Sequence, residues 1–164
     1  MNKKGLYAAA KAAGMCRDGK RKLRHAKSID ELVVFFKENI IWLVEHDYPP
    51  VAVLREHYAG FYNEWAAADA KGVEFFNQER VFVALASEGA AHYTHGKRGR
   101  VFVLHDSELT IYAENDTFVV VSVFDNARVT IRPTETAKVY VYLHGNAQVV
   151  DTPDCPQQII IEKR

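Results

Sequence analysis

The stretch that decides the fold contains Ala127-Arg-Val-Thr-Ile, Ala137-Lys-Val-Tyr-Val and Ala147-Gln-Val-Val, which repeat one pattern every ten residues. Three further segments keep the same phase: Ser107-Glu-Leu-Thr-Ile, Thr117-Phe-Val-Val-Val and Gln157-Gln-Ile-Ile-Ile. The first position of each unit is small or polar, and the third and fifth are usually Leu, Ile or Val. Alternation of this kind is typical of strands with one buried face. The stretch therefore predicts an internal repeat of short strands.

The repeat begins before residue 107. Arg80-Val-Phe-Val recurs twenty residues later as Arg100-Val-Phe-Val. We therefore expect the repeat to cover 79–164, with one unit, 99–106, shortened to eight residues. Turn-forming residues separate the units: Glu114-Asn115-Asp116, Asp125-Asn126, Glu135-Thr136, Gly145-Asn146 and Pro153-Asp154-Cys155-Pro156.

Two architectures fit a ten-residue strand repeat: a β-solenoid with two units in each coil, and an antiparallel β-meander that closes toward a barrel. Equivalent positions stack directly in a solenoid, so similar residues recur in register. Ala127, Ala137 and Ala147 recur in this way, each at a position that suits a tight corner. The pattern favours the solenoid, a parallel β-helix-like fold with an aliphatic interior.

Several aromatic residues fall at outward-facing positions of the repeat. They predict a surface aromatic patch, which is either a binding surface or the surface on which the helical domain docks. The residues of this patch are Tyr112, Phe118, Tyr140 and Tyr142.

Residues 1–72 are predicted to form a small helical domain, which makes the chain α+β. Helices are expected over 6–13, 29–46 and 51–58, with further helical turns over 65–72. Ser28 and Glu31 have the spacing of a capping box, and Gly14 and Gly60 suit helix ends.

Composition limits the class of protein. The chain has 164 residues, of which 48% are hydrophobic and 26% charged, so neither a disordered nor a fibrous protein is favoured. No long hydrophobic segment opens the chain, so we expect neither membrane insertion nor secretion. Cys16 and Cys155 lack a CxxC spacing, which favours reduced thiols and a cytoplasmic location, with a disulfide as the alternative.

Charge is concentrated at the beginning of the chain. Residues 1–30 hold nine Lys and Arg against two Asp and Glu. The basic segment is a candidate site for phosphate, nucleic acid or another partner; its residues are Arg17, Lys20, Arg21, Lys22, Arg24 and Lys27. The alternative is a solvated surface, because no aromatic residues alternate with these charges. Asp18-Gly19 is expected to form a turn within the segment.

The sequence contains little that indicates catalysis. His92 and His95, with His105, are the one candidate constellation for zinc, but a polar turn explains them as well, and we predict no metal. No HExxH, GxSxG or phosphate-loop pattern is present. We therefore expect a protein that is not an enzyme, with no catalytic residues and no cofactor.

The corners Asp125-Asn126-Ala127-Arg128-Val129 and Gly145-Asn146-Ala147-Gln148-Val149 resemble the short ten-residue-repeat β-helix modules of uncharacterised bacterial and bacteriophage-associated proteins. The resemblance covers the C-terminal half. It implies a scaffold and supplies no catalytic residues.

These observations together predict a structural or interaction protein in which a helical domain caps a β-solenoid. Self-association is expected, because a terminal coil leaves strand edges unpaired. Ile159-Ile160-Ile161 either pair with another copy or are shielded by Glu162-Lys163-Arg164. The alternative function is that of a phage or mobile-element factor that binds nucleic acid, or a host nucleic-acid-handling complex, through the basic segment.

Overall fold

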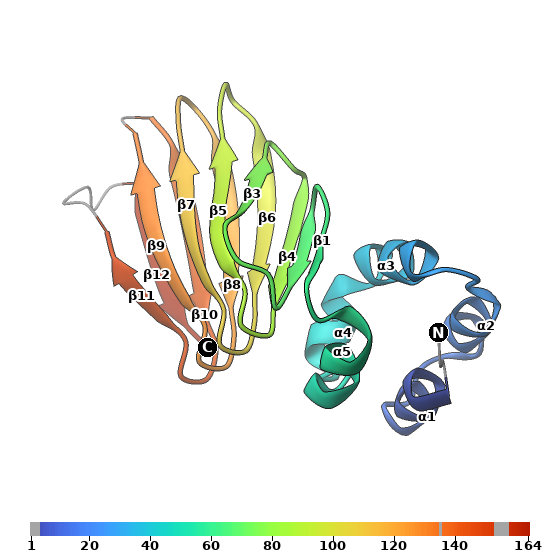
Figure 1. Cartoon of the computed structure of the whole chain (residues 1–164). Helices are drawn as coiled ribbons and strands as arrows, with labels where there is room; N and C mark the ends of the chain where they lie inside the picture. Colours follow the sequence, from blue (N-terminus) through green and yellow to red (C-terminus); the bar gives the residue numbers. More distant parts are fainter. Residues whose placement is uncertain (1–3, 135, 153–157) are drawn as a thin grey trace. The chain divides into compact units, whose positions relative to one another are not determined.

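The structure, a computed structural model, describes residues 4–134, 136–152 and 158–164. The chain divides into two compact units, Met1–His57 and Tyr58–Arg164 (Figure 1). The first unit is helical and the second is a β-solenoid of about five turns. The predicted α+β class with a C-terminal solenoid is confirmed.

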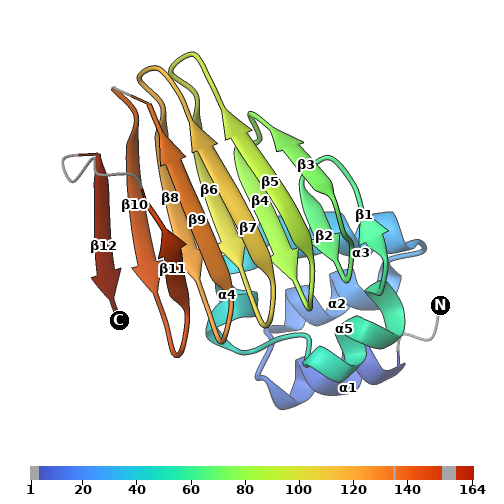
Figure 2. The ribbon, with the colours of Figure 1, turned by 60° about the vertical axis from the view of Figure 1, so that its left-hand side comes forward.

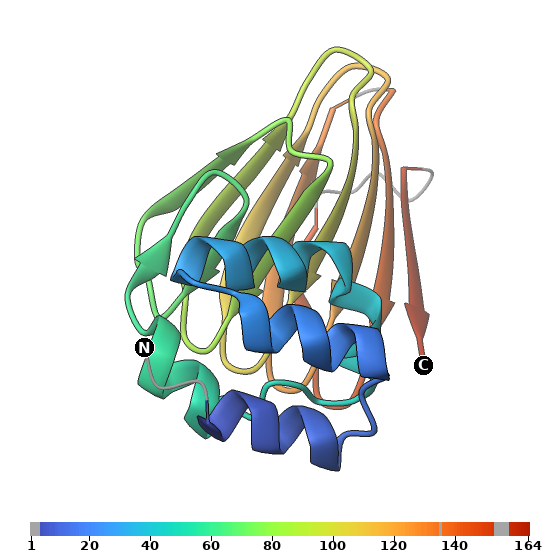
Figure 3. The ribbon, with the colours of Figure 1, turned by 90° about the vertical axis from the view of Figure 1, so that its right-hand side faces the viewer.

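The helical unit is drawn in colours from blue to green in Figure 3. The helices of the described chain are α1 Lys4–Ala12, α2 Arg17–His25, α3 Ile29–Glu38, α4 Ile40–Glu45 and α5 Val51–Tyr58. Leu6, Leu23 and Leu32 are fully buried and form part of the core of this unit. The Tyr48 hydroxyl donates a hydrogen bond of 3.0 Å to the Leu6 carbonyl and so joins distant segments of the chain.

Local signals placed most of the helix ends correctly. The Ser28 hydroxyl accepts a 3.1 Å hydrogen bond from the Glu31 amide, as a helix N-cap should. The Glu31 carboxylate bonds the amide of Lys27 instead of that of Ser28, at 2.6 Å. Gly14 and Gly60 follow α1 and α5 with positive φ, as expected for residues that end helices.

Two predictions for the helical unit are wrong. The single helix expected over 29–46 is divided at Asn39, which has φ −117° and ψ 18° and separates α3 from α4. Its side chain donates a 2.8 Å hydrogen bond to the Phe35 carbonyl, and this local bond competes with helix continuation. Asp18-Gly19 is not a turn but lies in the first turn of α2, where the Gly19 amide donates to the Cys16 thiol at 3.3 Å.

The solenoid consists of two sheets of mostly parallel strands (Figures 1 and 2). The seven-stranded sheet contains, in spatial order, β1 Phe61–Tyr62, β2 Ala66–Ala68, β4 Arg80–Ala84, β6 Arg98–Val103, β8 Phe118–Val123, β10 Lys138–Leu143 and β12 Ile159–Lys163. The five-stranded sheet contains β11 Gln148–Asp151, β9 Arg128–Pro133, β7 Glu108–Ala113, β5 Glu88–Tyr93 and β3 Val73–Phe76. Successive strands along the chain from β2 to β12 alternate between the sheets.

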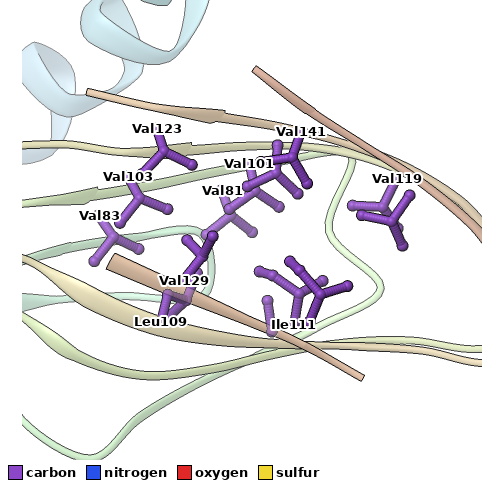
Figure 4. Close-up of a cluster of buried hydrophobic side chains, with 14 of the residues drawn as sticks. Val81, Val83, Val101, Val103, Leu109, Ile111, Val119, Val123, Val129 and Val141 are labelled. Carbon is purple, nitrogen blue, oxygen red and sulfur yellow. The ribbon is translucent and has the colours of Figure 1, made fainter. Parts of the chain in front are cut away.

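Equivalent residues stack at intervals of twenty. Val81 pairs with Val101, Val101 with Val121, and the column continues through Val141 to Ile161. Valines of one sheet and aliphatic residues of the other fill the interior (Figure 4). The described pairings are parallel except between β1 and β2, so the solenoid prediction is confirmed and the antiparallel meander is excluded.

The corners also follow the predicted pattern. Ala127, Ala137 and Ala147 are buried in the core cluster, as expected at tight corners. Asp125 and Gly145 adopt positive φ, a conformation that Asp tolerates and Gly favours. Glu135 and the predicted turn at Pro153-Asp154-Cys155-Pro156 lie outside the described residues.

No unit is shortened at 99–106, which corrects the sequence prediction. Val101 pairs with Val121 and Leu109 with Val129, so both sheets keep an interval of twenty across this region. Gly99 occupies an inward position where neighbouring strands have a valine, and this hid the register. A Cβ at Gly99 would lie 2.2 Å from the ring of Tyr93, which is fully buried there.

The solenoid begins earlier than residue 79. Ala66 pairs with Phe82 and Val73 with Gly89, so the first coil is the short one, with an interval of sixteen residues. The helical turns expected over 65–72 are wrong, because 66–68 forms strand β2. Alanine has high helix propensity, but these three alanines are buried in a sheet, and tertiary burial overrides propensity.

Candidate functional surfaces

The C-terminal end of the solenoid exposes part of its apolar interior. Among the described residues, β12 pairs only with β10 and is the last strand of its sheet (Figures 2 and 3). Ile161 continues the inward column above Val141, yet it is 45% exposed whereas Val141 is fully buried. Ile160, which faces outward, is also exposed. The interior of the repeat therefore reaches an open end at β12.

The two strands at this end differ in how they present their edges. β11 has a register shift between Val149 and Asp151, and Asp151 forms an ion pair with Arg132. Bulges and charges are common devices that protect edge strands from pairing. β12 keeps unbroken register with β10 over all five of its residues. The β12 edge is thus the one suited to pairing with another strand.

Residues 162–164 do not shield the isoleucines. Glu162 and Lys163 continue β12 in register with Tyr142 and Leu143. The Arg164 amide donates a 2.9 Å hydrogen bond to the Leu143 carbonyl, so it also prolongs the strand.

At the N-terminal end of the same unit, the chain covers the edge strand of the five-stranded sheet. The Tyr62 hydroxyl donates to the Glu74 carbonyl at 2.6 Å and accepts from the Glu74 amide at 3.2 Å. Glu74 belongs to β3, the edge strand of its sheet, and the Tyr62 ring packs on Phe75 with centroids 5.8 Å apart. Val73 and Phe75 are buried as a result of this coverage and of the core beneath them.

The predicted aromatic patch is not one surface. Tyr112 lies on the five-stranded sheet, where its ring stacks on His92 with centroids 4.8 Å apart. The other three residues lie on the seven-stranded sheet. There the Phe118 and Tyr140 ring centroids are 5.2 Å apart, and Arg164 lies over the Tyr142 ring at 4.0 Å. Two faces of the solenoid therefore carry separate aromatic groups.

The three histidines considered for zinc do not converge. His92 Nε2 lies 2.6 Å from a Glu74 carboxylate oxygen on the five-stranded sheet. His95 is a corner residue with positive φ, and His105 Nδ1 accepts from the Leu85 amide at another corner. Within the part of the chain that the structure describes, no group of three His, Cys, Asp or Glu residues is placed to hold a metal.

Four of the six predicted basic residues line one groove of the helical unit. The groove contains Arg17, Lys20, Arg21 and Arg24, together with Tyr7, Asp18 and His25. Arg24 donates to the Tyr7 hydroxyl at 2.7 Å and lies 4.8 Å from the centre of its ring. Lys22 instead lies 3.7 Å from Glu38, and Lys27 lies outside the groove.

An aromatic residue is therefore present beside the basic segment, contrary to the sequence interpretation. Tyr7 is seventeen residues before Arg24 in the chain, and the pairing of α1 with α2 brings them together. Part of the basic charge is neutralised, because Arg21 forms a 2.7 Å ion pair with Asp18.

A second basic and aromatic surface lies on the seven-stranded sheet and was not predicted. Arg98 and Lys138 flank Phe118 on adjacent strands at the same register position. They line a groove with Gly96, Asp116, Thr117, Phe118 and Thr136, which we call the Phe118 groove. The residues of this row are twenty positions apart in sequence, so no local motif reveals them.

One histidine at the C-terminal end of the sheet has a perturbed titration. Burial lowers the pKa of His144, and the nearby positive charge of Arg164 lowers it further. The imidazole stacks on Phe124 with ring centroids 4.4 Å apart.

Comparison with models of protein families, with curated proteins and with solved structures finds no match to this chain. Among the described residues, no helix is long and apolar enough to span a membrane.

Proposed function

We propose that the protein is a non-enzymatic structural scaffold whose solenoid self-associates through its C-terminal coil. The observation that carries this proposal is the open end at β12, where Ile161 continues a buried column but is 45% exposed. An unpaired strand edge beside exposed apolar side chains is a template for a further strand.

A second copy of the chain is the occupant that suits this edge. At the N-terminal end, Tyr62 bonds both backbone groups of Glu74 on β3, and the other edge strand, β1, has only two residues and pairs antiparallel with β2. Neither strand offers an edge like that of β12, which favours a meeting of two C-terminal ends over head-to-tail growth into a filament. A two-fold axis then pairs β12 antiparallel with its copy and gives a closed dimer.

Light scattering on purified full-length chain tests this proposal with a matched pair of variants. Ile161→Lys places a charge at the open edge, and we expect it to yield monomer under conditions where the unmodified chain is dimeric. Val34→Lys is the control, because Val34 is 52% exposed on α3 of the helical unit. Equal masses for the two variants would contradict the proposal.

A second candidate function is nucleic-acid binding by a phage or mobile-element factor, directly or through a host complex. It is favoured by the contact of Arg24 with Tyr7, because stacking aromatics beside basic charges are typical of single-strand binding. The groove residues Arg17 and Lys20 supply further positive charge.

Binding of a fluorescent single-stranded oligonucleotide at several salt concentrations tests this candidate. Replacing Arg21, Lys22 and Arg24 together with Gln should weaken binding and reduce its salt dependence, because fewer counterions are released. Equal binding and equal salt dependence of the unmodified chain and the triple variant would argue against this function.

A further inference from the structure

We infer that the Phe118 groove is a binding site for the phosphate and base of a nucleotide. The site lies wholly within the solenoid unit, and the inference is independent of self-association and of the basic segment on α2. The bound nucleotide is either a free mononucleotide or one nucleotide within a single strand.

Two cationic side chains define the anion-binding part of the site. Arg98 and Lys138 occupy the strands on either side of Phe118, in one row across the sheet. Adjacent strands are about 4.8 Å apart, so the backbones that carry the two charges are about 10 Å apart. Long side chains anchored at this separation can converge on one phosphate group.

The charges of this row are not neutralised by the protein. Within the described residues, neither the Arg98 guanidinium nor the Lys138 ammonium forms an ion pair or a hydrogen bond. The five-stranded sheet is different, because basic residues on it or just before it pair with carboxylates. These pairs are Lys71 with Glu88, Arg128 with Glu108, and Arg132 with Asp151. The unpaired row is therefore a specific feature of one face.

Phe118 supplies an apolar surface between the two cations. Its side chain is 37% exposed, and one part of the ring packs on Tyr140 at an interplanar angle of 42°. Stacking of a base on an aromatic ring stabilises nucleic-acid complexes whatever the base, because every base has a flat face. A phosphate flanked by a planar ring is the chemistry that this arrangement recognises.

Asp116 narrows the class of ligand. Asp116 lines the same groove as Arg98 and Lys138, so its negative charge would repel a polyphosphate there. A sugar hydroxyl can instead donate to this carboxylate. One phosphate, one sugar and one base together match the residues of the Phe118 groove, which favours a monophosphate unit.

Calorimetric titration of the full-length chain tests the site with four probes: adenosine monophosphate, adenosine, inorganic phosphate and oligodeoxythymidine. Adenosine monophosphate should bind at least about tenfold more tightly than phosphate or adenosine, since stacking and charge both contribute. Binding of the oligonucleotide without the mononucleotide would identify a single strand as the source and would also support the inference.

Variants separate this site from other basic surfaces. Arg98→Gln and Lys138→Gln should each weaken binding about tenfold, because each removes a charge-assisted hydrogen bond. Arg128→Gln is the matched control on the five-stranded sheet and should leave affinity unchanged. The oligonucleotide is also titrated into the triple variant of Arg21, Lys22 and Arg24. This variant weakens binding at α2, so the binding that remains is assigned to the Phe118 groove.

Absence of binding of both nucleotide probes to the unmodified chain would overturn the inference. Unchanged affinity in Arg98→Gln and Lys138→Gln, or equal affinity for phosphate and adenosine monophosphate, would also overturn it.

Discussion

The two ends of the solenoid differ in how far their edge strands and apolar interior are covered. At the N-terminal end, Tyr62 bonds the backbone of β3 and its ring covers Phe75. At the C-terminal end, β12 has one free edge among the described residues and Ile161 is 45% exposed. The repeat alone does not explain this difference, because coils of the same pattern would leave the same kind of strand edge at both ends. The difference arises from the flanking chain, and it favours stacking between copies at the C-terminal end.

The largest expected effect compares a buried isoleucine of the interior with the exposed isoleucine at the open end. Ile131 is fully buried in β9, so Ile131→Ala should lower the free energy of unfolding by about 2–5 kcal/mol. Ile161→Ala removes a side chain that is 45% exposed and should cost the monomer much less. Urea unfolding at low protein concentration measures the loss of unfolding free energy in both variants. Equal losses would contradict the claim that Ile161 is less buried than the interior residues.

A smaller effect is expected when the hydrogen bonds between Tyr62 and the edge strand β3 are removed. Tyr62→Phe removes the hydroxyl that bonds Glu74 and should cost about 1 kcal/mol of unfolding free energy. It also frees the β3 edge, so species larger than a dimer should form in sedimentation velocity. Tyr112→Phe is the control, because the Tyr112 hydroxyl has no hydrogen-bond partner within the described residues. Identical unfolding free energies and identical sedimentation of the two variants would contradict a role of the Tyr62 hydroxyl in covering the β3 edge.

The smallest effect concerns His144 near the open end. Its pKa lies below the ordinary 6.5 in the folded chain, mainly because of burial and also because of Arg164. The folded state thus binds this proton more weakly than the unfolded state, so the stability contribution is lost as the pH falls from about 6.5 through the lower folded pKa. In Arg164→Gln the pKa should rise but stay below 6.5. Titration of the imidazole by NMR measures this, and an unchanged pKa would contradict the electrostatic contribution.

The sequence was sufficient for the repeat because small corner residues and alternating valines recur at a fixed interval. Predictions from the sequence were wrong where residues depart from this pattern. Gly99 hid an inward position, because the Tyr93 ring occupies the space that a side chain there would fill. Ala66–Ala68 indicated helix by propensity, and only burial between neighbouring strands makes them a strand.

The candidate surfaces depended more on spatial register than on local motifs. The open edge at Ile159-Ile160-Ile161 was predictable, since it ends the repeat. The row of Arg98, Phe118 and Lys138 required the twenty-residue register of the coils. Tyr62 was not recognisable as a cap, because its partner Glu74 is twelve residues away on a strand that no repeat pattern marks.

Sedimentation equilibrium of the unmodified chain over a wide concentration range tests the central claim most directly. A closed dimer joined at β12 predicts that the mass rises from the monomer value of 18.6 kDa to twice that value and then stops rising. A mass that stays at 18.6 kDa at the highest concentration would contradict self-association, and a mass that continues to grow would contradict the meeting of two C-terminal ends.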